Sequence, residues 1–187
     1  ILGTLFLANK ALASVDWKSI VPGISFGEGG GTGNIESFKS LIGQESGQDY
    51  NKLVMTSGEQ VTPAKKLTEM SLSEIGNLQD EMISKKYPSS AVGRYQIDKT
   101  TLQEWSKQEG MDPDKTIYNE ETQDRLLKRG LINAGLEKFK KGEISKEEFQ
   151  MNVAKRWAAV PVPQDITKEN GTVIKKGESY YKDRGNN

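Results

Sequence analysis

The chain contains 187 residues, a length that suits one domain with an appendage, and its 26 basic and 26 acidic residues cancel. Only 34% of the residues are hydrophobic and the mean hydropathy is −0.66, so we expect a polar chain with a modest core. The balanced charge gives no electrostatic reason to expect a nucleic-acid partner. Because the chain has neither cysteine nor histidine, disulfides, zinc-thiolate sites, cysteine nucleophiles, Ser-His-Asp triads and histidine-based zinc hydrolysis are excluded.

Residues 1–15 form the most apolar stretch, which is too short to span a bilayer. Ala11-Leu12-Ala13 matches a signal-peptidase site, although no basic region precedes it. Four interpretations compete: the end of a signal peptide, the end of a membrane anchor, a packing helix, or a segment docked on a partner. We favour docking or packing. The glycine-rich stretch at 23–33 is predicted to be a flexible linker, and no Gly-Lys-Ser/Thr follows it to form a nucleotide-binding loop.

Residues 34–44 are predicted to form a helix, with Asn34 as its N-cap and Gly47 as its stop. Four apolar residues recur there at helical spacing, namely Ile35, Phe38, Leu41 and Ile42. Glu45 continues the same stripe at the end of the helix. Burial and the negative end of the helix dipole both raise the pKa of such a carboxyl, and an acid protonated near neutral pH can serve as a general acid. The alternative is a solvated carboxylate on a frayed last turn.

Further along the chain, Leu53-Val54-Met55 is compatible with a short strand in a small β-element. Ser71 to Glu74 has the spacing of a capping box, and the apolar periodicity that follows predicts a helix to about Lys86. Asp98 is a predicted N-cap for a helix that stops at Gly110.

The later part of the chain is also predicted to be mostly helical. Asn119 caps a helix that Gly130 interrupts, and helix resumes over 131–139. A second capping box starts at Ser145, and Pro161 is expected to end its helix. Asn170-Gly171 between β-prone runs predicts a hairpin in the polar tail. The predicted class is α+β, mainly α, divided into residues 1–33, 34–162 and 163–187.

Two stretches are rich in polar side chains that can reach a ligand. The first contains Ser46, Tyr50 and Asn51, which we regard as candidate substrate-binding residues, and the second spans residues 90–96. In the second stretch Tyr95 can stack on a sugar ring, and the Gln96 amide can donate to and accept from hydroxyl and acetamide groups. The alternative is a turn glycine followed by a half-buried core tyrosine and a helix-entry glutamine.

The two stretches resemble the peptidoglycan lytic enzymes of the bacteriophage lambda endolysin type. The resemblance rests on Ser-Ala-Val-Gly-Arg-Tyr-Gln-Ile at 90–97, preceded by Ile-Gly-Gln-Glu-Ser-Gly at 42–47. It extends to Thr-Gln-Asp at 122–124, Lys-Arg-Gly at 128–130 and Arg-Trp-Ala-Ala-Val-Pro at 156–161. It therefore covers the chain from about residue 35 to residue 161, in the same order.

The resemblance implies a lysozyme-like fold with a cleft for glycan strands. It implies that Glu45 is catalytic, that Ser46 belongs to the Glu-Ser pair of lytic transglycosylases, and that Tyr95 and Gln96 hold the glycan. Asn51 falls where the lambda-type enzymes carry an aspartate, and the 56–85 region differs from theirs in length and composition.

The activity that the resemblance implies is that of a lytic transglycosylase, which needs one acid/base and neither metal nor cofactor. Such an enzyme cleaves the bond between N-acetylmuramic acid and N-acetylglucosamine and leaves 1,6-anhydro ends. Two alternatives remain: a two-carboxylate lysozyme with Asp49 or another acid as partner, and a non-catalytic peptidoglycan-binding module. The expected setting is a phage virion or a released phage enzyme acting on the bacterial wall, with residues 1–33 contacting a phage tail or envelope-machine protein.

Overall fold

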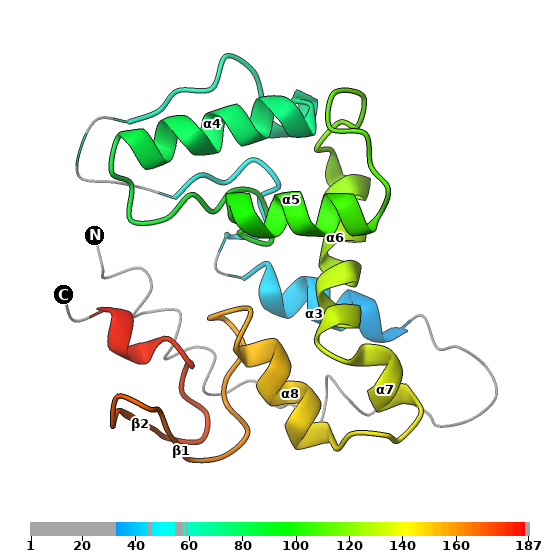
Figure 1. The fold of residues 1–187 in the computed structure, drawn as a ribbon, viewed down its shortest axis with the longest axis vertical. Helices are drawn as coiled ribbons and strands as arrows, with labels where there is room; N and C mark the ends of the chain where they lie inside the picture. The colour runs from blue at the N-terminus through cyan, green and yellow to red at the C-terminus, as the bar shows by residue number, and fades with distance from the viewer. Residues whose placement is uncertain (1–32, 45, 55–57, 59, 186–187) are drawn as a thin grey trace. The chain divides into compact units, whose positions relative to one another are not determined.

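The computed structural model describes residues 33–44, 46–54, 58 and 60–185 (Figure 1). These residues form six α-helices, two short 3-10 helices and one two-stranded sheet, so the expectation of a mainly helical α+β chain is confirmed. The chain divides into two compact units, one formed by the described residues of 46–130 and the other by 33–44 together with 131–185. The apolar segment at 1–15 and the predicted acid Glu45 lie outside the described residues.

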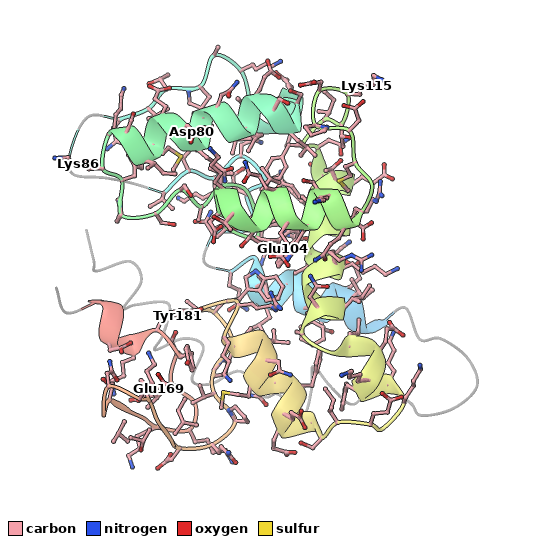
Figure 2. All side chains as sticks on the ribbon, viewed as in Figure 1. Asp80, Lys86, Glu104, Lys115, Glu169 and Tyr181 are labelled. Carbon is pink, nitrogen blue, oxygen red and sulfur yellow. The ribbon has the colours of Figure 1, made fainter. Side chains whose placement is uncertain are left out.

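The first unit is built from η1 (Leu67–Glu69), α4 (Leu72–Ser84), α5 (Lys99–Gln108) and α6 (Glu120–Asn133), of which the part up to Gly130 belongs to this unit. Helices α4 and α5 lie side by side (Figure 1). Asp80 on α4, labelled in Figure 2, pairs with Lys99 at the start of α5. The side chains that fill the core of this unit include Leu67, Ile75, Met82, Val92, Ile97, Leu102, Trp105, Leu126 and Leu127.

Side-chain caps begin the helices of the first unit where the sequence predicts them. The Ser71 hydroxyl accepts a hydrogen bond from the Glu74 amide at 3.2 Å, and the Glu74 carboxylate accepts one from the Ser71 amide at 2.6 Å. This is a complete capping box. Asp98 caps α5 and Asn119 caps α6, each through a bond of 2.9 Å to a backbone amide three residues later. These three predictions are confirmed.

The second unit contains α3 (Gly33–Ile42), α7 (Leu136–Lys140) and α8 (Lys146–Ala154). The Phe149 ring on α8 stacks on Phe139 at 5.0 Å and meets the edge of Phe38 on α3 at 5.9 Å. Phe38, Leu41 and Ile42 are all buried, as the predicted apolar stripe requires. The Ser145 hydroxyl caps α8 by accepting from the Glu148 amide.

The tail after residue 163 folds back onto its own unit. Strands β1 (Ile166–Thr167) and β2 (Val173–Ile174) pair antiparallel around Asn170-Gly171, so the predicted hairpin is confirmed. Ile174 is fully buried, and Val162 exchanges backbone hydrogen bonds with Glu178 and Gly177. Glu169, labelled in Figure 2, is exposed on this tail, whereas Tyr181, also labelled, is half-buried and its hydroxyl donates to the Lys155 carbonyl.

Some predicted boundaries are wrong. Gly130 does not interrupt its helix, because a glycine weakens a helix without ending it; α6 continues to Asn133 and the break comes at Gly135, whose φ is +104°. Helix α8 ends at Ala154, well before Pro161. A proline prevents a helix from continuing through it, but the helix can end at an earlier residue. Helix α3 includes Asn34, so this residue is not the N-cap.

The predicted strand near residue 53 is reduced to single bridges among the described residues. Leu53 bridges Val92, and Val92 also bridges Ile97. Met55 lies outside the described residues. In the part of the chain that the structure describes, no helix is both long and apolar enough to cross a bilayer.

Replacing Ser71 by alanine should lower the free energy of unfolding by about 1 kcal/mol, because the Glu74 amide then loses its acceptor. The matched control is Ser84→Ala at the other end of α4, where the hydroxyl only bonds the Glu81 carbonyl and the change should stay within about 0.5 kcal/mol. Urea denaturation followed by circular dichroism measures both. Equal losses at the two serines would show that the capping box contributes nothing.

Candidate functional site

The two polar stretches singled out in the sequence meet within the first unit. The Gly93 amide donates to the Lys52 carbonyl at 2.8 Å. The Arg94 guanidinium donates to the Tyr50 hydroxyl at 2.8 Å, across 44 positions of sequence. The segment 50–52 and the loop 93–96 are therefore hydrogen-bonded to each other and form one cluster, which we call the tyrosine site.

The loop 93–96 is a tight turn closed by its own backbone. Val92 and Ile97 exchange backbone hydrogen bonds of 3.2 and 3.1 Å on either side of it. The Gln79 amide of α4 donates to the Ser90 and Ile97 carbonyls and so anchors the base of the loop. Gln96 has a φ of +49° and its amide donates back to the Gly93 carbonyl at 2.8 Å.

Left-handed backbone at residues other than glycine is uncommon and costs free energy, and it concentrates at functional sites. In the described part of the chain three such residues occur, Gln48, Lys86 and Gln96. Two of the three fall in or next to the stretches predicted to bind substrate. Gln96 therefore lies in the tyrosine site and Gln48 lies two residues before it in the sequence.

Gln123 is a buried residue whose side chain hydrogen-bonds to both stretches. Its amide nitrogen donates to the Tyr50 and Tyr118 carbonyls, each at 3.0 Å, and its oxygen accepts from the Arg94 amide at 2.9 Å. The side chain is fully buried, and both amide hydrogens and the oxygen are used. A buried amide satisfied in this way fixes the position of every group that it contacts.

Asp124 joins the two tyrosines of the site. Its Oδ1 accepts from the Tyr50 hydroxyl at 2.9 Å and from the Tyr95 hydroxyl at 2.6 Å. The two rings meet edge to face at 6.1 Å, and the Arg94 guanidinium lies over both, 5.0 Å from the Tyr50 centroid and 5.4 Å from that of Tyr95. Burial, together with the Asp124 carboxylate, raises the pKa of Tyr95 far above its usual value, so this phenol stays protonated and donates.

Asn51 is oriented by Thr68 in η1. Its Oδ1 accepts from both the amide and the hydroxyl of Thr68, each at 3.1 Å. Since the Thr68 amide can only donate, the Asn51 oxygen must face Thr68 and its NH₂ group must face the other way. Asp49 is exposed, and its Oδ1 accepts from the backbone amide of Asn51 at 2.8 Å.

The predicted binding residues differ in how much of their surface is exposed and could contact a ligand. Tyr50, Asn51 and Gln96 are half-buried, whereas Ser46 is 4% exposed and Tyr95 is fully buried. The Tyr95 ring therefore has no open face in this structure, and its hydroxyl is committed to Asp124. The binding roles of all five residues stay predictions.

Gln123, Asp124 and Thr68 were not among the predicted site residues. A Gln-Asp pair in the first turns of a capped helix has the sequence pattern of a solvated helix start, so nothing in its spacing marks it as buried. The one signal was that Thr-Gln-Asp at 122–124 belongs to the resemblance. Thr68 lies in a short 3-10 turn that no apolar periodicity predicts.

Within the described residues no cluster of three or more acidic side chains could hold a metal ion.

Comparison of the chain with protein-family models, with curated proteins and with solved structures gave no match.

Replacing Gly93 by alanine should destabilise the protein by about 2–4 kcal/mol. The residue has a φ of +77°, and a Cβ would overlap the Gln123 oxygen and lie 2.9 Å from the Tyr118 hydroxyl. The matched control is Gly110→Ala, where φ is +65° but the space is open, so only the backbone cost of about 1 kcal/mol applies. Thermal and urea unfolding measure both, and equal losses would mean that Gln123 does not hold the loop.

Proposed function

We propose that the protein is a peptidoglycan lytic transglycosylase with a lysozyme-like fold and a glycan-binding cleft. Its substrate is the glycan strand of the bacterial wall, and its acid/base is Glu45. The observation that supports this proposal most directly is the direct bonding of the Gly93–Gln96 loop to the Tyr50–Lys52 segment. The resemblance identifies the first of these with the glycan-holding loop, and the second follows the predicted catalytic Glu45 by a few residues in the sequence.

The orientation of Asn51 supports a mechanism with one carboxylate. This residue falls where the lambda-type enzymes carry an aspartate, but an amide neither ionises nor accepts a proton in this pH range. Its oxygen is occupied by Thr68, so only the NH₂ group is left to face a ligand, as a hydrogen-bond donor. A donor suits the acetamido carbonyl or a hydroxyl of an amino sugar.

The proposed reaction needs no second protein carboxylate because the nucleophile belongs to the substrate. The Glu45 carboxyl gives its proton to the glycosidic oxygen, and the bond from that oxygen to C1 of the muramic acid residue breaks. The 6-hydroxyl oxygen of the same residue then bonds to C1, and its proton passes to the Glu45 carboxylate. The acid is thereby regenerated, and no water is consumed.

The location of this activity is also proposed from the resemblance to phage enzymes. A phage-encoded enzyme, carried in the virion or released in the cell, would act on the wall from the periplasmic side. Residues 1–33 would link it to a phage tail or envelope-machine protein.

Replacing Glu45 by glutamine should lower the rate of peptidoglycan solubilisation by about 10³-fold or more, because the amide cannot transfer a proton. The matched control is Asp49→Asn, which removes the carboxylate four positions later in the sequence yet keeps an oxygen to accept from the Asn51 backbone amide. The single-carboxylate mechanism predicts that Asp49→Asn retains activity within about threefold of wild type. Turbidity loss of purified sacculi measures both variants.

Each contrary result points to a different account. A loss of activity in Asp49→Asn as large as that in Glu45→Gln would favour a two-carboxylate lysozyme. Wild-type activity in Glu45→Gln would refute the assignment of the acid. Wild-type protein that sediments with sacculi without solubilising them would favour a non-catalytic binding module.

A further inference from the structure

The structure separates the two tyrosines of the site into different roles. Tyr95 is fully buried, whereas Tyr50 keeps part of its side chain in contact with solvent. Only Tyr50 can therefore meet a ligand without rearrangement. Both hydroxyls nevertheless donate to the same atom, Oδ1 of Asp124.

We propose that Asp124 is a positioning residue that holds Tyr50 as the glycan-facing ring, with Tyr95 as its buried support. This inference rests on the proposed function. Both tyrosines are predicted substrate-binding residues in the sequence, and this inference keeps the contact with the sugar for Tyr50 alone. It also gives a role to Asp124, which does not itself touch the sugar.

The geometry explains why one carboxylate can fix the ring. A tyrosine ring moves through two side-chain torsions, so packing on one side alone leaves it free to swing. Tyr50 is held at its tip by Asp124, on its face by the Arg94 guanidinium, and by an edge-to-face contact with the Tyr95 ring. The bonds from the phenols to the carboxylate are charge-assisted and therefore stronger than bonds between neutral groups.

The position of Asp124 is itself fixed by the helix. It follows Gln123, whose three hydrogen bonds hold the backbone of Tyr50, Arg94 and Tyr118. The backbone of the tyrosine and the tip of its side chain are thus held by consecutive residues of α6. Loss of Asp124 should release the ring while the backbone of Tyr50 stays anchored.

The test measures binding in the Glu45→Gln background, so that turnover does not consume the probe. Co-sedimentation with purified peptidoglycan sacculi gives the affinity of each variant. Asp124→Ala should weaken binding about tenfold, because the ring loses its position, whereas Asp124→Asn should weaken it by only about two- to fivefold, since the amide oxygen still accepts. Glu121→Gln removes an exposed charge from the same helix and should change the affinity less than about twofold.

A double-mutant cycle separates positioning from mere stability. Tyr50→Ala alone should weaken binding about as much as Asp124→Ala, and the double variant should lose no more than either single variant. Carbon-13 NMR of labelled tyrosine rings, with Tyr50→Phe and Tyr95→Phe for assignment, should show both signals shifted in Asp124→Ala. Binding is compared at a temperature where every variant is folded.

The outcomes distinguish this inference from the proposed function. Additive losses, or unchanged affinity in a folded Asp124→Ala protein, would overturn the positioning role. If the protein with Glu45 intact releases no muropeptides while the coupling between Asp124 and Tyr50 persists in binding, the catalytic function fails and the positioning role stands. If no variant binds sacculi, the positioning role is overturned, and the release of muropeptides by the protein with Glu45 intact still decides the proposed function.

Discussion

The tyrosine site depends on the side chains of Gln123 and Asp124, consecutive residues near the start of α6. Gln123 fixes the backbone of Tyr50 and of Arg94, and Asp124 fixes the hydroxyls of Tyr50 and Tyr95. Two chain segments that are remote in sequence are thereby held against one helix. Buried polar groups stabilise a structure only when their hydrogen bonds are complete. The Gln123 amide meets this condition because both of its N–H groups donate and its oxygen accepts.

The same contacts make the strained loop possible. Position 93 requires glycine, because its φ is positive and a Cβ would overlap the Gln123 oxygen. Gln96 also adopts a left-handed conformation, which its side-chain amide stabilises by donating to the Gly93 carbonyl. The Gln79 amide supports the base of the loop from α4. A loop held in this way is pre-organised, which lowers the entropy cost of binding a ligand such as the proposed glycan.

Sequence reasoning succeeded where the signal is local. The caps at Ser71, Asp98 and Asn119, the apolar stripe of α3 and the hairpin at Asn170-Gly171 each depend on a few adjacent residues. It failed where the outcome depends on distant packing. Gly130 continues its helix although a glycine often marks an end. The burial of Gln123 and Tyr95 follows from tertiary contacts that no period in the sequence encodes. The candidate site residues were chosen from the two polar stretches and from the resemblance, and the hydrogen bonds that connect them are visible only in the structure.

The most direct test of this account is mass spectrometry of the muropeptides that the purified protein releases from peptidoglycan. The account predicts 1,6-anhydromuramic acid at the new glycan ends, because the nucleophile is the hydroxyl of the substrate itself. Ends that carry a reducing N-acetylmuramic acid would contradict the single-carboxylate mechanism. The absence of any released muropeptide from folded protein would contradict the enzymatic function itself.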